Sequence, residues 1–169
     1  METTRERLVR YLNDAWAVEK GLVPVLKDMS DDANDPQIKA LFEQHRQITH
    51  QQEEALEARI RALGEEPSGS KGFFSQFISQ IGEFLHRAKD DYDQTTQHLM
   101  KAYATENFEC AMYRSLEVYA TEIGDTDTAN LARAHMQQEK DAAQKVWELI
   151  DAAARRPVQV STAVRDVAA

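Results

Sequence analysis

The sequence predicts an all-α fold, a four-helix bundle with one long connection after the second helix. The 169 residues include only 6 Gly and 4 Pro, so little interrupts helical periodicity. Hydrophobic residues make up 42% of the chain and charged residues 29%, which is typical of a globular domain with a sizeable core. Long segments repeat apolar residues at alternating spacings of three and four, whereas strand-like alternation is nearly absent.

The first two long helices are predicted at residues 3–29 and 36–63. Pro24 is expected to kink the first helix because it removes one backbone donor. Asp35 followed by Pro36 indicates the N-cap and the first residue of the second helix. We expect the inner face of the second helix to consist of Ile38, Leu41, His45, Ile48, Gln52, Leu56, Ile60 and Leu63.

The long connection follows Gly64, a residue suited to ending a helix. Residues 64–72 are predicted to form a loop, and the segment after them is short and amphipathic. Its bulky apolar stripe predicts an extra crossover helix that packs on the bundle, with an oligomer contact as the alternative. The stripe contains Phe73, Phe74, Phe77, Ile78, Ile81, Phe84 and Leu85.

The third and fourth long helices are predicted at residues 91–123 and from about 126 to 154, with Gly124 ending the third. The remaining residues show no strong periodicity and are expected to be loose or packed on a neighbour. The predicted organisation is therefore a helical-bundle domain at 1–154 and a C-terminal tail at 155–169.

Charge and composition disfavour several classes of protein. The net charge of −9 and the pI near 5.0 disfavour binding to nucleic acid, because an acidic surface repels phosphate. No apolar run reaches the length of about 18 residues that a membrane span needs. The N-terminus lacks the features of a signal peptide, and the single Cys110 excludes an internal disulfide framework. We therefore expect a cytoplasmic protein with no membrane partner.

Polar residues interrupt the apolar face of each predicted long helix near its middle. Because helices of similar length pack side by side, their midpoints are expected to lie in one layer of the bundle. A buried unpaired carboxylate costs several kcal/mol, and four together add like-charge repulsion. One or two divalent metal ions would offset this charge, and carboxylate with imidazole suits iron, manganese or zinc. Bundles with two metals place glutamates on two helices and Glu-x-x-His motifs on the others. The interrupting residues are Glu19, His45, Gln52, Glu106, Glu109, His135 and Glu139.

Structural roles are the alternative for each of these residues taken singly. A lone glutamate on a seam can accept a hydrogen bond from a tyrosine, and Tyr11 and Tyr113 are near enough in the pattern to donate one to Glu19. A lone core histidine is usually satisfied by its neighbours. Glu106 and Glu109 give the stronger signal, because residues one helical turn apart face the same side.

Four stretches around these residues give the chain a family resemblance. It resembles the YciF-like branch of the ferritin-like superfamily over nearly its whole length, to about residue 154. The resemblance implies a ferritin-like four-helix bundle with an added crossover helix, a homodimer and a link to stress responses. It also implies a carboxylate-bridged di-iron centre. The matching stretches are "YLNDAWAVEKGL", "LFEQHRQITHQQEEALEARIRALGEEPS", "YATENFECAMYRSLEVYATEIGDTDTANLA" and "QQEKDAA".

Position by position, the resemblance assigns Glu19 as the metal ligand of the first helix. Glu106 and Glu109 are similar to the Glu-x-x-Glu pair of rubrerythrin-like third helices. Glu139 is similar to the bridging glutamate of the fourth helix, and His45 matches a histidine common in this branch.

Two positions depart from the family pattern, so both Glu-x-x-His motifs are incomplete. Ile48 stands where the branch typically has a glutamate, and Ala142 stands where a ferritin-like motif would place its histidine. His135, together with His45 or Gln52, could substitute from the same faces. The departures could equally leave a single-metal site or none.

Two main functions follow from these alternatives. The first is a stress-associated protein with a buried carboxylate-rich site for two iron ions, with manganese or zinc as alternatives. The second is a non-enzymatic structural or stress protein with a degraded metal site. The sequence does not decide whether the protein is an enzyme. A third option, an iron-storage shell that protects DNA, is disfavoured by the acidic charge.

Overall fold

The fold is all-α, as predicted. The protein was analysed as a computed structural model that describes residues 1–68 and 88–167. No strand occurs within these two ranges. The predicted crossover helix lies outside the described residues. The four described helices are α1 Thr4–Asp32, α2 Pro36–Ala62, α4 Asp91–Glu122 and α5 Thr126–Val167.

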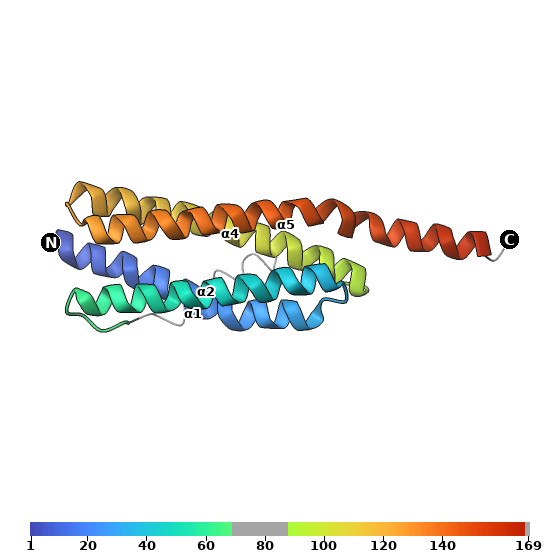
Figure 1. Ribbon diagram of the computed structural model, residues 1–169, viewed down its shortest axis with the longest axis horizontal. Helices are drawn as coiled ribbons and strands as arrows, with labels where there is room; N and C mark the ends of the chain where they lie inside the picture. The colour runs from blue at the N-terminus through green and yellow to red at the C-terminus, as the bar shows by residue number, and fades with distance from the viewer. Residues whose placement is uncertain (69–87, 168–169) are drawn as a thin grey trace.

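The helices form two antiparallel hairpins that pack as two layers (Figure 1). α1 packs mainly on α2, and α4 mainly on α5. α2 ends at the opposite end of the bundle from the start of α4, so these two helices run in the same direction (Figure 1). This arrangement requires a connection that returns along the bundle, which is the crossover topology predicted from the sequence.

Local signals in the sequence position the helix ends. The Thr3 hydroxyl accepts a hydrogen bond from the Glu6 amide at 3.1 Å, and the Glu6 carboxylate accepts one from the Thr3 amide at 2.7 Å, which completes a capping box. Asp35 accepts from the amide of residue 37 at 2.8 Å, as its position before Pro36 predicts. Gly64 and Gly124, which follow α2 and α4, both have φ of 77°, a conformation that glycine adopts without a Cβ penalty.

The last helix is longer than predicted. An end near Ala154 is wrong, because α5 continues through Pro157 to Val167 and projects beyond the rest of the bundle (Figure 1). Proline costs a helix one hydrogen bond. The alanines and arginines that precede it are strong helix formers, which favour continuation.

The inner face of α2 differs from the predicted one at three positions, one of which is Leu63, a half-buried residue that follows the end of the helix. Phe42 and Thr49 are buried at 1% exposure, whereas Leu41 and Ile48 are only half-buried. The buried positions follow one another at spacings of four and three that alternate as far as Leu56, which keeps them on one face of the helix. They are Ile38, Phe42, His45, Thr49, Gln52, Leu56 and Ile60.

The hydrophobic core is divided into two clusters, one toward each end of the bundle. The first includes Leu12, Leu56 and Tyr113, and the second includes Leu26, Phe42 and Leu99. Buried polar residues from all four helices lie in the layer between them, namely Glu19, His45, Gln52, Glu106, Glu109, His135 and Glu139. The helices therefore place the polar interruptions of the sequence at the centre of the bundle.

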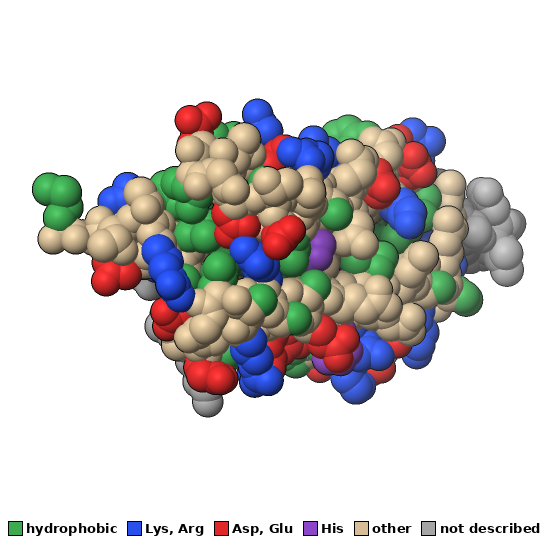
Figure 2. Space-filling model, turned by 60° about the vertical axis from the view of Figure 1, so that its left-hand side comes forward, with side chains coloured by type: hydrophobic (Ala, Val, Ile, Leu, Met, Phe, Trp, Pro, Cys, Tyr) green, Lys and Arg blue, Asp and Glu red, His purple; other side chains and the backbone are tan. Residues whose placement is uncertain are grey.

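The surface carries charges of both signs. On the face shown in Figure 2, acidic and basic side chains are interspersed with apolar side chains. Trp147 is 57% exposed and packs beside Tyr103, with ring centroids 5.2 Å apart. None of the helices in the described ranges combines the length and the apolar character needed to cross a membrane.

Candidate metal centre

Four buried side chains converge at the centre of the bundle. His45 from α2, Glu106 and Glu109 from α4 and Glu139 from α5 each offer one donor atom, and these atoms all lie within 4.8 Å of one another. The His45 Nε2 atom lies 2.9 Å from Glu106 Oε2 and 3.7 Å from Glu139 Oε2. Three helices thus contribute an imidazole and three carboxyl groups to one compact cluster, the four-residue cluster.

Glu19 from α1 lies beside the four-residue cluster and is fully buried. The Tyr113 hydroxyl donates a hydrogen bond to its Oε1 atom, the partner that the sequence suggested. Glu19 raises the pKa of Glu109, whereas Glu109 lowers the pKa of Glu19, so the two carboxyl groups lie side by side. The centre therefore contains four carboxyl groups, including the four-residue cluster's three.

His135, the remaining predicted ligand, lies outside the four-residue cluster. Its ring packs edge-on against Tyr113, with centroids 5.2 Å apart and planes at 88°. Burial lowers the pKa of His135 to about 4, so this imidazole is neutral at physiological pH. It is connected to Glu19 through Tyr113 rather than by direct contact.

Several polar atoms at the centre lack a protein partner. No donor from the described parts of the chain reaches either carboxyl oxygen of Glu109, and the same holds for Glu19 Oε2 and Glu139 Oε2. Buried polar groups in native proteins are nearly always satisfied. Unsatisfied carboxyl oxygens that face one another are what a bound cation would complete, so the residues present fit a metal ion.

Burial is the main cause of the altered pKa values of the acids. It raises the pKa of Glu19 to about 8, although the hydrogen bond from Tyr113 opposes this shift. The pKa values of Glu109 and Glu139 are also raised, first by burial and then by the neighbouring carboxylates. Without a metal, the centre therefore retains protons at neutral pH, which limits the repulsion among its acids.

His45 has the opposite balance of effects. Burial lowers its pKa, but the charges of Glu106 and Glu19 together outweigh burial, so the pKa lies above the ordinary value. The metal-free centre thus favours a protonated His45 paired with Glu106. A metal ion would have to displace this proton before the Nε2 atom could bind it.

The two departures from the family pattern lie together in the structure. Ile48 and Ala142 line one cavity of about 90 Å³ between α2 and α5, which His45 also lines. The positions of the absent glutamate and the absent histidine are therefore next to the four-residue cluster. Neither residue offers a metal-binding atom.

Two further buried polar residues lie on the inner face of α2, one and two helical turns after His45. The Gln52 amide donates to Glu139 and, at 3.1 Å, to Gln138. Thr49 is 1% exposed, and its hydroxyl has no partner among the described residues. Sequence reasoning missed Thr49 because it assigned Ile48 to the inner face. The spacing of four residues from His45 was the signal that could have identified it.

The fold and the buried His/Glu cluster define a ferritin-like helical-bundle protein. The chain belongs to the family described as "Domain of unknown function (DUF892)", whose model matches residues 3–159. None of the curated proteins matches the chain.

Solved structures give the same fold. A protein from Xanthomonas campestris pv. campestris is 28% identical, with a TM-score of 0.76, over 97% of this chain and 99% of that one. The Escherichia coli stress protein YciF is 19% identical with a TM-score of 0.81, over 92% and 99% of the two chains. Dps from Thermosynechococcus elongatus is 16% identical with a TM-score of 0.70, over 87% and 92%. These likenesses show that the chain has the ferritin-like helical-bundle fold.

Proposed function

We propose that this protein binds iron at the centre of its bundle. The observation that carries the proposal is the convergence of one imidazole and three carboxyl groups within 4.8 Å, with unsatisfied carboxyl oxygens around them. Mixed oxygen and nitrogen donors suit iron, manganese or zinc, and the resemblance to the ferritin-like superfamily, which implies a di-iron centre, favours iron.

Charge balance supports two ions rather than one. Each divalent ion offsets two carboxylates, and the centre contains the four carboxyl groups of Glu19, Glu106, Glu109 and Glu139. We place one ion at the four-residue cluster and a second, more weakly held ion where Glu19 adjoins Glu109. His135 is then a neutral residue near the second position, connected to it through Tyr113.

Bound iron would supply one-electron redox chemistry with a small oxidant. The residues of this chain would hold the ions, neutralise their charge and exclude bulk water. Tyr113 stays protonated because burial raises its pKa well above the ordinary value, so its hydroxyl orients the Glu19 carboxyl group. The Gln52 side-chain amide likewise donates to the Glu139 carboxyl group and orients it. Such partners of metal ligands typically change metal affinity by about 10- to 100-fold.

Elemental analysis of the purified protein tests the proposal. Expression in iron-supplemented, zinc-depleted medium is needed, because zinc binds most sites of this kind more tightly than ferrous iron does. We expect iron in the wild type and its loss in Glu106→Ala and Glu139→Ala. Glu117→Ala, which removes a buried glutamate paired with arginines outside the centre, is expected to retain iron. Absence of iron, manganese and zinc from the wild type would contradict the proposal.

A structural protein with a degraded metal site is the second candidate. Ile48 and Ala142, side by side at the four-residue cluster, favour it because two family ligands are absent from one place. In that case, Glu19 and Glu139 remain neutral acids held by Tyr113 and Gln52. The elemental analysis separates the two candidates, since this one predicts no stoichiometric metal.

We also propose that the protein is cytoplasmic, that it forms a homodimer and that it is associated with a stress response. The resemblance to the YciF-like branch and the structural likeness to the Escherichia coli stress protein YciF support this proposal. Light scattering coupled to size exclusion would give the mass of the assembly. A monomer or a large shell would contradict the dimer.

A further inference from the structure

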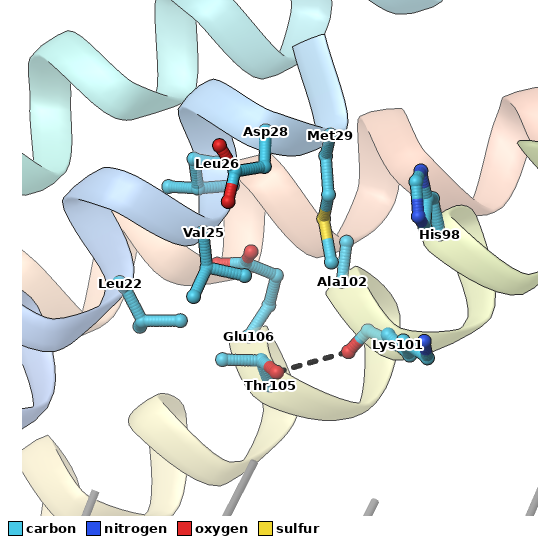
Figure 3. Close-up of a pocket in the computed structure, with 10 residues that line it drawn as sticks. All are labelled: Leu22, Val25, Leu26, Asp28, Met29, His98, Lys101, Ala102, Thr105 and Glu106. Carbon is cyan, nitrogen blue, oxygen red and sulfur yellow. Dashed lines mark hydrogen bonds between the residues drawn. The ribbon is translucent and has the colours of Figure 1, made fainter. Parts of the chain in front are cut away.

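A cavity between α1 and α4 extends from the surface to the metal centre. Its volume is about 170 Å³, and it runs from the exposed Asp28 to the buried Glu106. Figure 3 shows the Glu106 carboxyl group between the two helices, behind Val25 and Leu26. Since Glu106 contacts His45, a molecule in this cavity would reach the four-residue cluster without any movement of the backbone.

The walls of the cavity are mainly apolar. Leu22, Leu26 and Met29 come from α1, and Ala102 comes from α4. Thr105 is also in the wall, but its hydroxyl donates to the Lys101 carbonyl oxygen at 2.9 Å, so its hydrogen is not available to a guest molecule (Figure 3). A charged guest would lose its hydration here with little compensation.

The outer end of the cavity has little net charge. Asp28 and Lys101 carry opposite charges, and both line the cavity. His98 is the third polar residue there, and burial lowers its pKa, so it is neutral at physiological pH. The entrance therefore attracts neither anions nor cations strongly.

We infer that this cavity, the α1–α4 channel, admits a small uncharged oxidant, dioxygen or hydrogen peroxide, to the centre. The inference rests on the proposed iron site. Apolar cavities of about 150 Å³ accept xenon or benzene, whereas drug-sized organic substrates need about 300–1,000 Å³. Iron held by His45, Glu106, Glu109 and Glu139 would supply two electrons to the oxidant, and solvent would supply two protons. Hydrogen peroxide would then give two waters as its O–O bond breaks, and dioxygen would give hydrogen peroxide.

A second cavity approaches the centre from the other side and offers a competing route. It is the 90 Å³ cavity between α2 and α5, whose lining includes Gln44, Gln138, Asp141 and Lys145. This lining is more polar than that of the α1–α4 channel, and the space is about half as large. An apolar oxidant is therefore expected to prefer the α1–α4 channel.

Xenon binding to the metal-free protein tests the channel without reference to activity. We expect xenon-pressurised crystals of the wild type to show xenon between α1 and α4, and crystals of Ala102→Leu to lack it. Ala111→Leu is the matched control, because Ala111 lies on the same helix but lines a separate cavity that contains no residue of the centre. Wild-type crystals without xenon in the channel would overturn the inference.

Oxidation of the iron-loaded protein tests the route itself, after iron content has been equalised. We expect Ala102→Leu to slow oxidation by dioxygen or by hydrogen peroxide at least about ten-fold, and Ala111→Leu to leave it within about two-fold. Val25→Phe narrows the channel at a half-buried position and should slow the reaction even if Ala102→Leu fails to fold. Comparison of the two oxidants identifies the reactant.

Three results would overturn the channel. The first is an unchanged oxidation rate in both Ala102→Leu and Val25→Phe. The second is an equal slowing of oxidation by ferricyanide in these variants, because ferricyanide is charged and does not need the channel. The third is a slowing by Ala142→Leu alone. In each of these cases the iron site could still be present, and iron content would show it. If the wild type binds no iron, the proposed function fails, and the xenon experiment still decides whether the channel admits small apolar molecules.

Discussion

Glu109→Gln is expected to abolish tight metal binding and, at the same time, to make the metal-free protein more stable. Glu109 is fully buried, and neither of its carboxyl oxygens has a donor among the described residues. Its raised pKa reports the cost of burying it beside Glu19, Glu139 and Glu106. A neutral amide removes this repulsion and can donate to the unsatisfied Glu19 Oε2 atom.

The two effects can be measured separately. A buried acid with a raised pKa costs the folded state about 1.4 kcal/mol per pKa unit at pH values where it ionises in the unfolded state, so urea unfolding at pH 8 without metal should show a gain of at least about 1 kcal/mol. Metal affinity should fall at least about 100-fold, because the loss of a ligand exceeds the loss of a residue that merely supports one. A destabilised variant that still binds metal would contradict our account of the centre.

Glu117→Gln is the matched control on the same helix. Glu117 is also buried, but Arg114 and Arg133 donate to it at 2.8 Å, and the hydrogen bond from Arg114 is the main reason that its pKa is lowered. Its removal should destabilise the protein and leave metal binding unchanged. Two buried glutamates two turns apart are thus expected to respond with opposite signs, because one has cationic partners and the other has only carboxyl neighbours.

The second large effect is a loss of stability of the metal-free protein as pH rises. Burial raises the pKa of Glu19 to about 8 in the folded state, from an ordinary value of 4.5. Between these values the folded state binds more protons than the unfolded state, so stability falls as pH increases. The raised pKa values of Glu109, Glu139 and His45 act in the same direction. We expect the free energy of unfolding to decrease by a few kcal/mol between about pH 5 and pH 8.

Saturating metal should remove or reverse this trend, because the ions bind the deprotonated side chains. Urea unfolding at pH 5, 6.5 and 8, with and without metal, measures the difference, and calorimetry in buffers of different ionisation enthalpy measures proton release. Glu109→Gln should show a weaker pH dependence than the wild type. Stability of the metal-free wild type that rises across this range would contradict the raised pKa values.

The sequence predicted the architecture well because helix ends depend on local chemistry. Asp35 before Pro36, and glycines at 64 and 124, specify caps and terminators that need no tertiary context. The end of α5 was missed because proline is only a costly residue within a helix, and the residues around Pro157 compensate for it.

The candidate site was predictable in its composition but not in its geometry. Spacing along each helix identified the inward-facing glutamates, whereas contacts between helices depend on their relative rotation and shift. Spacing alone does not distinguish His45, which lies in the four-residue cluster, from His135, which lies against Tyr113. The structure buries Thr49 on the inner face of α2, whereas the prediction placed Ile48 there. This difference of one residue is a small rotation of the helix about its axis, which the pattern of a single sequence resolves poorly.

The division of the core into two hydrophobic clusters has a consequence for how the chain folds. Apolar contacts make each end of the bundle cohesive, but the layer between the ends buries carboxyl groups, which costs free energy of desolvation, instead of apolar surface. Folding without metal therefore leaves the two halves weakly coupled along the helix axis. An ion held by α2, α4 and α5 would act as a cross-link at the weakest level of the bundle, and would make the two halves fold as one cooperative unit.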